Sequence, residues 1–327
     1  MSEQADPSTI SIYVPVTREL ALVEDHLRRV ASEGVGPLAG LLDYVVDTGG
    51  KRIRPAITLL ASRFYAQDYT LPVIMAAAVE LLHVATLIHD DTVDNSSLRR
   101  GKATVGSVWG RNAAVLLGDY VFATSATFVC DTGNIRAIRR FSETIMELSS
   151  GELLEYFSTY KWEQSEEDYR DRIYRKTASL FSTSAETGAI LSGAPEPAIQ
   201  ALKAYGRHIG MAFQIVDDIL DVLGSSDEIG KPVGNDLLQG VLTLPTIKLI
   251  ERYPDDNPVK ALFQDGDAGG NLKAAMDMIR NSGIVEECYA VVRDYCMKAS
   301  TDLESLEPGP SKQTLLDLAS YVVERTR

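Results

Sequence analysis

The chain has 327 residues, enough for one large domain or two ordinary ones. It is 45% hydrophobic and 24% charged, a composition typical of a soluble globular protein with a sizeable core. A formal net charge of −14 argues against nucleic acid or an anionic membrane as the main partner, because both are themselves negative. Any anionic ligand must therefore be met by locally gathered basic residues or by metal ions.

Cysteine usage and the N-terminus predict a cytoplasmic protein. Cys130, Cys288 and Cys296 show no CxxC spacing, so we expect buried thiols in a reducing compartment and no disulfide or metal framework. Residues 1–11 are polar, lack the apolar core of a signal peptide and are expected to form a flexible or pairing arm. The apolar stretch 73–89 contains charged and polar residues and stops at two aspartates, which indicates a core helix and no membrane span.

Apolar residues recur at helical spacing along most of the chain, with glycine- and proline-rich turns between the helices. In chain order, helices are predicted over 16–31, 38–46, from Pro55 to about 66, from about 70 to 100, 112–130, 135–161, 166–193, around 209–221, 244–253 and in three later segments. Residues 96–107 are expected to form a loop with a helix start, and 224–232 a glycine-rich loop. Few stretches alternate like strands and no repeat is evident. The sequence therefore predicts an all-helical bundle, with residues 1–327 forming a single domain.

The main functional signal is a DDxxD cluster that occurs twice, each time after an apolar helical run. Asp90 and Asp94 lie one turn apart on the same helix face, with Cβ atoms about 6 Å apart. Such carboxylates repel one another and need cations, and hard oxygen ligands favour Mg²⁺. One cluster could equally be a solvated helix end, but two of identical spacing favour a metal site. The carboxylates concerned are Asp90, Asp91, Asp94, Asp217, Asp218 and Asp221.

Basic residues recur beside both clusters of this acidic chain. They are Lys51, Arg52, Arg54, Arg99, Arg100, Lys176 and Lys231. Arginine offers two donors to a phosphate, and lysine offers a mobile charge. The glycines that open the run 49–54 let the backbone approach a phosphate, and the following helix start attracts anions. Each residue alone could be a surface charge, but together they predict two anion sites beside metal ions that hold a diphosphate.

These motifs resemble those of the trans-type (head-to-tail) isoprenyl diphosphate synthases, over nearly the whole chain. They are GGKRIRP at 49–55, LLHVATLIHDDTVDNSSLRRGKATV at 81–105, KTA at 176–178, FQIVDDILD at 213–221 and GKPVGNDLLQG at 230–240. The resemblance implies an isoprenoid-synthase bundle with a central cavity and a Mg²⁺-dependent condensation of isopentenyl diphosphate with an allylic diphosphate. It also implies a homodimer, and a product whose apolar tail can draw the protein to membranes.

The resemblance also assigns roles to single residues. The metal ligands are Asp90, Asp94 and Asp217, with Asp91, Asp218 and Asp221 assisting, for about three Mg²⁺ ions per site. The isopentenyl diphosphate site is Lys51, Arg54, His83 and Arg100, and the allylic diphosphate site is Arg99, Lys176, Thr177, Gln214 and Lys231. Lys176 joins Asp90, Asp91, Asp94, Asp217 and Asp218 in the catalytic set.

Helical spacing agrees with part of this assignment. His83 lies two turns before Asp90 and only about 20° round the helix, so it can face the same cavity, although alone it could be a core histidine. Gln214 precedes Asp217 by three residues and shares its face. No side chain is an obvious general base, so the resemblance assigns the proton to the released diphosphate. Apolar walls below the aspartates would keep water from a carbocation.

Small residues below Asp90 predict a long product. Thr86 lies one turn below Asp90 and close to its face, whereas Ala85 sits about 140° away, so its role in chain length rests on the resemblance. The small residues Ala123, Ser125 and Ala126 would leave further room, and Phe128 could form a floor. The match in this region is to long-chain synthases, so we hypothesise a product above twenty carbons.

The sequence departs from the pattern of the family it resembles at two positions, and several rival interpretations stay open. Val241 stands where the family usually has lysine, and Glu155 where glutamine is common in the family. A class I terpene cyclase or a head-to-head synthase would lack GGKRIRP, and a non-catalytic subunit of a heteromeric synthase would tend to lose an aspartate cluster. A shorter-chain (farnesyl or geranylgeranyl) synthase stays open.

Overall fold

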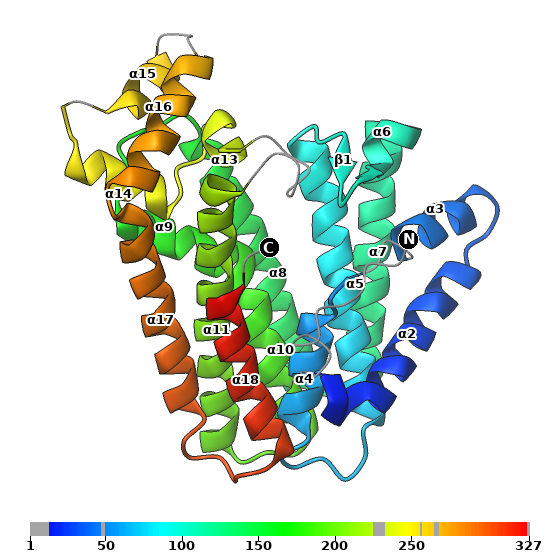
Figure 1. Ribbon diagram of the computed structural model, residues 1–327. Coiled ribbons are helices and arrows are strands. Elements are labelled where there is room, and N and C mark those ends of the chain that lie inside the picture. Colours follow the sequence, from blue (N-terminus) through cyan, green and yellow to red (C-terminus); the bar gives the residue numbers. More distant parts are fainter. Residues whose placement is uncertain (1–12, 47–49, 225–232, 256, 265–267, 326–327) are drawn as a thin grey trace. The chain divides into compact units, whose positions relative to one another are not determined.

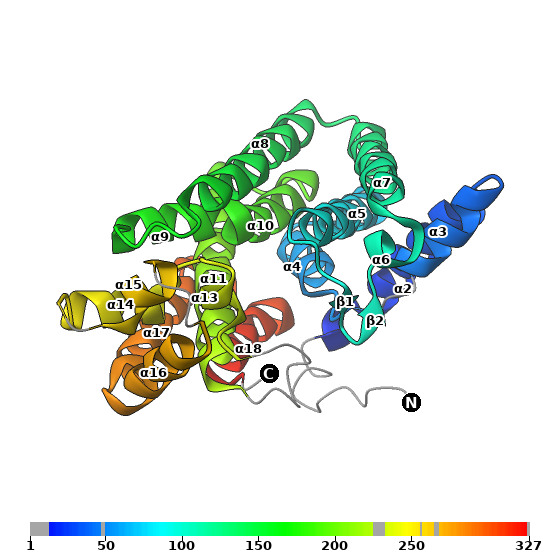
Figure 2. The same ribbon diagram turned by 90° about the horizontal axis from the view of Figure 1, so that it is seen from above.

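The computed structural model describes residues 13–46, 50–224, 233–255, 257–264 and 268–325. This part of the chain is helical apart from one hairpin of two-residue strands, which confirms the all-helical prediction (Figures 1 and 2). The chain forms two compact units, which are described separately. The first comprises Met1–Ser142, Thr183–Lys203 and Ser305–Leu315, and the second comprises Glu143–Ser182, Ala204–Glu304 and Leu316–Arg327. A single domain over the whole chain stays a prediction.

The first unit is built around one long helix. Its elements are η1 (Val14–Val16), α2 (Thr17–Ser32), α3 (Pro37–Val46), α4 (Ile53–Ser62), α5 (Thr70–Val93), β1 (Leu98–Arg99), β2 (Lys102–Ala103), α6 (Val105–Trp109) and α7 (Arg111–Asp131). Helices α2, α4 and α7 all pack against α5 (Figure 1). Residues 75–82 of α5 are buried all round, and all of them except Glu80 are apolar, as expected of a core helix.

The second unit holds most of the C-terminal half. Its elements are α8 (Ile135–Ser158), α9 (Glu166–Ile173), the π-helical turn η2 (Tyr174–Ala178), α10 (Ser179–Leu191), α11 (Glu196–Leu223), α13 (Asn235–Leu238), α14 (Leu244–Arg252), α15 (Pro258–Gln264), α16 (Ala268–Asn281), α17 (Ile284–Asp302) and α18 (Pro310–Glu324). Helices α8, α10, α11 and α18 each contribute residues to both units. Helix α9 begins with a capping box, in which Ser165 and Asp168 satisfy each other's backbone N–H groups.

The structure corrects three sequence predictions. The helix expected to reach Arg100 ends at Val93, because Asp94 caps it and Asn95 takes a left-handed backbone conformation (φ 51°). The helix predicted over 166–193 is interrupted by the π-helical turn η2. Among the cysteines, Cys288 and Cys296 are buried as expected, whereas Cys130 at the end of α7 is exposed.

Helices α5 and α7 are both long and apolar enough to cross a membrane by length and composition alone. They differ in burial, since 67% of the apolar window of α5 but only 33% of that of α7 lies inside the structure. Helix α5 is therefore a core helix by its contacts. Helix α7 instead carries an exposed apolar side, with Leu116 69% exposed.

Candidate active site

The first acidic cluster lies at the C-terminal end of α5. Asp90 and Asp91 belong to its last turn, and the backbone N–H of Asp94 donates to the carbonyl oxygen of Asp90 at 2.8 Å. Asp90 is half-buried and Asp94 exposed. Asp90 and Asp94 therefore keep the one-turn spacing that the sequence predicts, although Asp94 is the cap of the helix and not part of it.

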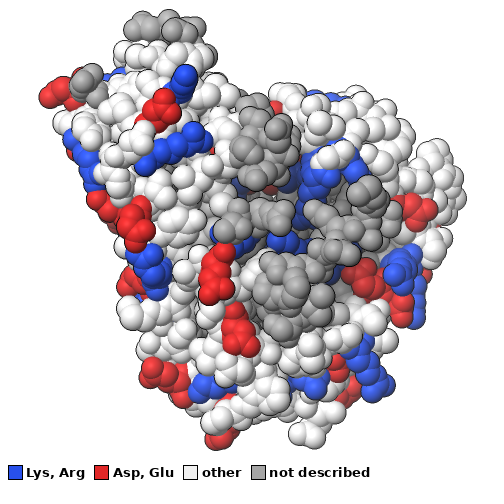
Figure 3. Space-filling model, viewed as in Figure 1, with Lys and Arg blue, Asp and Glu red and all other residues white. Residues whose placement is uncertain are grey.

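A hairpin returns basic residues to this cluster. The tip formed by Arg100 and Gly101 has positive φ at both positions (51° and 75°), and this backbone suits a tight two-residue turn. The turn lets Arg99 fold back, and its Nε donates to Asp91 Oδ1 at 2.7 Å. Figure 3 shows Lys and Arg side chains gathered around the end of α5 and the β1 hairpin. Arg99 thereby offsets the charge of Asp91, and its role at an allylic diphosphate stays a prediction.

His83 and Arg54 meet within the first unit, two turns of α5 below Asp90. Arg54 Nη1 lies 3.2 Å from His83 Nε2. Since a guanidinium only donates, this nitrogen accepts and the imidazole is neutral. Burial first, and then the charge of Arg54, lower the pKa of His83 well below its usual value. A neutral His83 beside a cation is consistent with an anion-binding role.

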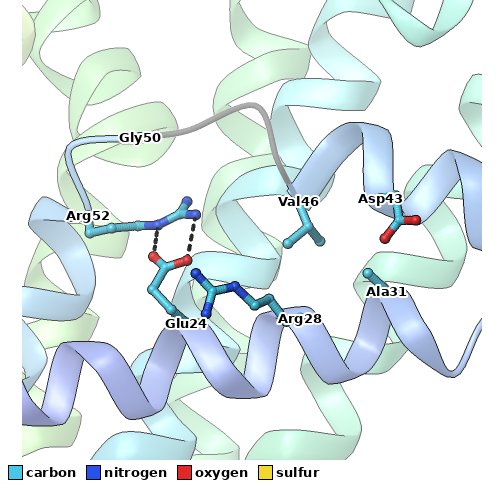
Figure 4. A pocket seen from close by; sticks show the side chains of 7 residues that line it. All are labelled: Glu24, Arg28, Ala31, Asp43, Val46, Gly50 and Arg52. Atoms are coloured by element: carbon cyan, nitrogen blue, oxygen red, sulfur yellow. Dashed lines mark hydrogen bonds and ion pairs between the residues drawn. The ribbon is translucent and has the colours of Figure 1, made fainter. Parts of the chain in front are cut away.

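Arg52, from the same basic run, bonds to two carboxylates instead of to His83. Its backbone is left-handed (φ 47°), and its Nε donates to Glu24 at 2.6 Å while Nη1 donates to Glu80 at 2.7 Å. Figure 4 shows Arg52 directed at Glu24 beside a cavity of about 520 Å³ lined by residues of α2 and α3. Of the run 51–54, Arg54 therefore meets His83, whereas Arg52 is committed to an internal ion pair.

The second acidic cluster lies near the end of α11, in the second unit. Arg325 Nη1 contacts Asp217 Oδ1 at 2.5 Å, and the same guanidinium lies over the ring of Phe213 at 4.5 Å. A cation from the residue that follows α18 thus contacts this carboxylate, and the role of Asp217 as a metal ligand stays a prediction.

Asp218 is buried (3% exposed) and held by a hydrogen-bond network. The hydroxyl of Tyr169 donates to Oδ2 at 2.6 Å, and Gln214 Nε2 donates to Oδ1 at 2.8 Å. Thr177 Oγ1 donates to Gln214 Oε1 at 2.6 Å, which fixes the amide. Burial, the largest effect, together with the charge of Asp217 raises the pKa of Asp218 to about 7 despite these donors. Gln214 thus bonds directly to Asp218.

Asp221, expected to assist at a metal, caps the short helix α13. Its carboxylate accepts from the backbone N–H groups of Asn235 (3.2 Å) and Asp236 (3.3 Å). Asp236 is itself a carboxyl that sequence reasoning missed. Burial first, and then the charge of Asp221, raise the pKa of Asp236 well above its usual value. A fourth acidic residue therefore belongs to the second cluster.

Lys176 projects from the π-helical turn η2 and meets two carboxylates of α8. Its Nζ lies 2.6 Å from Glu155 Oε1 and 3.0 Å from Glu152 Oε2. Gly151 permits the approach, because a Cβ there would lie 2.7 Å from the backbone nitrogen of Lys176. The unusual Glu155 is thereby neutralised. Nothing in the structure explains the valine at Val241.

The predicted chain-length residues of α5 lie on different faces. Ala85 is 1% exposed within the core, whereas Thr86 is half-buried and donates to the carbonyl oxygen of His83 at 2.9 Å. Phe128, expected as a floor, packs edge-on against His26 of α2, with ring centroids 5.7 Å apart. Lys51 is exposed, and Lys231 lies outside the described residues. The roles of these residues stay predictions.

The donor set fits magnesium only together with a ligand. Among the described residues, no three His, Cys, Asp or Glu side chains are placed to hold an ion by themselves. Mg²⁺ is usually bound by one or two carboxylates, with substrate phosphates and water completing six oxygens. The contacts of Asp91 and Asp217 with guanidinium groups show that both clusters attract cations. The residues present therefore suit ions that arrive with a diphosphate.

Several residues of these networks carry no motif signal of their own. Tyr169 and Arg325 lie 49 and 108 positions from the carboxylates that they contact. Gly151 could have been found, because a glycine inside a long helix calls for a packing reason. Asp236 could also have been found, because it lies within the motif at 230–240.

Comparison with known proteins places these features in a class. A family model described as polyprenyl synthetase matches residues 36–279. The chain is 37% identical to heptaprenyl diphosphate synthase component 2 of Geobacillus stearothermophilus, over 96% of this chain and 98% of that one. It is also 34% identical to a short chain isoprenyl diphosphate synthase of Methanothermobacter thermautotrophicus, over 86% and 89% of the two chains.

Solved structures agree. A decaprenyl diphosphate synthase from Rhodobacter capsulatus matches with a TM-score of 0.90 and 37% identity, over 98% of this chain and 99% of that one. A polyprenyl synthase from Caulobacter crescentus, complexed with calcium and isoprenyl diphosphate, matches with a TM-score of 0.91 and 30% identity, over 98% of both chains. The helical fold and these matches define a prenyltransferase. More narrowly, the chain belongs to the polyprenyl synthetase family, which confirms the resemblance to trans-type isoprenyl diphosphate synthases.

The Asp218 network gives a pH-dependent prediction. Tyr169→Phe should lower the free energy of unfolding by about 1–3 kcal/mol where Asp218 is ionised, above about pH 7, and by less near pH 5.5, where the carboxyl is protonated. The sign follows because the lost hydroxyl stabilises the charged form most. Denaturant unfolding in EDTA at both pH values measures it.

The matched control is Tyr289→Phe, which removes the same atom from a half-buried tyrosine of α17. It should show no difference between the two pH values. An equal cost of Tyr169→Phe at both pH values would contradict the assigned bond.

Proposed function

We propose that the protein catalyses a Mg²⁺-dependent, head-to-tail (1′-4) condensation of isopentenyl diphosphate with an allylic diphosphate, giving an all-trans polyprenyl diphosphate. The observation that carries the proposal is that each DDxxD cluster lies at or near the C-terminal end of a helix and contacts a cation, Arg99 at Asp91 and Arg325 at Asp217. Family membership supports the same reaction class. We further propose that both clusters bind Mg²⁺ ions that neutralise diphosphate.

Magnesium, about three ions per site, would neutralise the diphosphate that leaves. The chain's own residues have distinct tasks around it. Asp90, Asp94 and Asp217 would hold the ions, and Lys176 and Thr177 would orient the allylic diphosphate. Arg54 and neutral His83, with Lys51 and Arg100, would bind isopentenyl diphosphate.

The proposed reaction breaks one bond and forms another. The allylic C–O bond breaks, its electron pair leaves with the diphosphate, and an allylic carbocation remains. The terminal double bond of isopentenyl diphosphate attacks that carbon, and the new C–C bond leaves a tertiary cation. A proton is then lost to the released diphosphate, which restores a double bond. The apolar residues of α5 below Asp90 would exclude water from both cations.

Incubation of the purified chain with labelled isopentenyl diphosphate, farnesyl diphosphate and Mg²⁺ tests this reaction. We expect incorporation that EDTA abolishes, and losses of about 100-fold or more in kcat/KM for Asp90→Asn and Asp217→Asn. Asp255→Asn, an exposed carboxylate outside both clusters, is the matched control and should keep wild-type activity. Mg²⁺-independent turnover, or unchanged rates in the two cluster variants, would contradict the proposal.

For the product we propose a chain longer than twenty carbons. Support comes from the small residues below Asp90 and from relatives named for long products, although one similar relative is named a short chain synthase. Thr86 is half-buried on the side of α5 that carries His83, whereas Ala85 is enclosed in the core. Thr86 is therefore the position from which a larger side chain would reach a growing product.

Two phenylalanine variants separate these positions. Thr86→Phe should shorten the product by obstructing the path below Asp90, with little change in unfolding temperature. Ala85→Phe should also shorten it but should destabilise the fold by about 1–3 kcal/mol, because the added ring overpacks a filled core. Chromatography of the dephosphorylated products measures both. A wild-type product no longer than geranylgeranyl diphosphate would refute the long-chain proposal.

The assembly that we propose is a homodimer joined through α7. Helix α7 exposes Leu116 (69%), Val115 and Tyr120, which recur at helical spacing. Exposed apolar residues at this spacing are typical of an interface. The relative named component 2 makes a different partner chain the second candidate. The free cysteines fit a reducing compartment, and we propose the cytoplasm.

Light scattering of the pure chain tests the assembly. The wild type should have the mass of a dimer and Leu116→Glu that of a monomer, because an unpaired carboxylate is costly to bury. Val35→Glu, at an 83% exposed position between α2 and α3, is the matched control and should remain dimeric. A monomeric wild type that gains activity only with a second kind of chain would favour the heteromeric alternative.

A further inference from the structure

His89, the residue immediately before Asp90, contacts the neighbouring helix α7. Its Nε2 lies 3.3 Å from the carbonyl oxygen of Val115 and 3.5 Å from Asp119 Oδ1. A carbonyl oxygen only accepts, so Nε2 carries a proton and donates. The C-terminal turn of α5 is thus bonded to the backbone of α7 one residue away from a predicted metal ligand.

A glycine makes this contact possible. A Cβ on Gly118 would lie 2.2 Å from His89 Nε2 and 2.4 Å from its Cδ2, distances that real Cβ atoms do not show. Gly118 is buried inside α7, where glycine lowers helix stability relative to alanine. It therefore provides the space that the imidazole occupies. This hydrogen bond would be lost if His89 were replaced by a residue without a donor there, or if Gly118 were replaced by a larger residue.

The contact acts on the C-terminal end of α5, where Arg99 also bonds to Asp91. Asp94 and its neighbours lie past the end of the helix and are exposed, and Val93 is 54% exposed. The side chain of His89 is 37% exposed, so its contact with α7 lies at the edge of the α5–α7 packing and not in the core. Fixing His89 fixes the backbone of Asp90, whose carboxylate must meet a metal ion at a defined distance.

We propose that His89 is a positioning residue. By donating a hydrogen bond to α7 in the space that Gly118 leaves open, it holds Asp90 and Asp94 in the position that metal binding requires. The inference rests on the proposed function, since it assumes that these aspartates bind Mg²⁺. It assigns no contact with substrate to His89. Neither His89 nor Gly118 entered the site predicted from the sequence.

The first experiment compares His89→Ala with His89→Gln. The glutamine Nε2 can reach the position of the histidine Nε2 and donate to the Val115 carbonyl, whereas alanine cannot. We expect His89→Ala to raise the Mg²⁺ concentration for half-maximal activity by about 10-fold, and His89→Gln to remain within about 2-fold of the wild type. Electron paramagnetic resonance of Mn²⁺, titrated in the presence of inorganic diphosphate, should show the same order of affinities without turnover.

The second experiment changes Gly118 itself. Gly118→Ala should weaken Mn²⁺ binding about as much as His89→Ala, because the methyl group displaces the ring. In the His89→Ala background the same change should have little further effect, since no ring remains to be displaced. Gly40→Ala in α3, where an added methyl meets no atom within 4 Å, is the matched control. Unfolding in EDTA checks that each variant is folded.

The outcomes separate this inference from the proposed function. If the wild type binds no Mn²⁺ with diphosphate, the proposed function fails. If the wild type binds Mn²⁺ but His89→Ala binds equally well, the positioning role is overturned. The role is also overturned if Gly118→Ala weakens binding equally in both backgrounds, because Gly118 would then act without the imidazole.

Discussion

Mutual repulsion among closely spaced carboxylates is the constraint on which the rest of this structure depends. A helix that carries DDxxD cannot fold with several ionised aspartates side by side unless their charge is offset. The chain meets this requirement in different ways at different residues. Asp91 and Asp217 contact guanidinium groups, Asp218 combines a raised pKa with two hydrogen-bond donors, and Asp221 accepts from a helix N-terminus. Any ligand that brings magnesium must therefore offer more to these carboxylates than the protein already provides.

Some backbone irregularities lie at predicted site residues. The turn at Arg100 and Gly101 has positive φ values, and a π-helical turn presents Lys176. Such features cost conformational energy and are retained where geometry matters more than stability. The buried part of α5 shows none of them. Its regular helix supports the loops and caps at its end, so the precision of the site depends on an ordinary apolar core.

The family's residues account for chemistry that its members share, and not for the property in which they differ. Relatives named for heptaprenyl, decaprenyl and short products all match at similar identity, so membership of the family does not decide product length. We expect that property to depend on the size and direction of side chains below the acidic end of α5. Thr86 and Ala85 illustrate the point, since both are small and adjacent in sequence but differ in burial.

The sequence by itself determined the helical class, the two acidic clusters, the basic runs and the family, because each is a local pattern of residue types at helical spacing. Only the tertiary structure decided which charges meet. Arg99 turned back to Asp91, Arg52 was drawn into an ion pair with Glu24, and Arg325 reached Asp217 from 108 positions away. The physical reason is that a hydrogen bond depends on distances of about 3 Å, whereas residues far apart in the sequence carry no record of which partner the fold will bring to them.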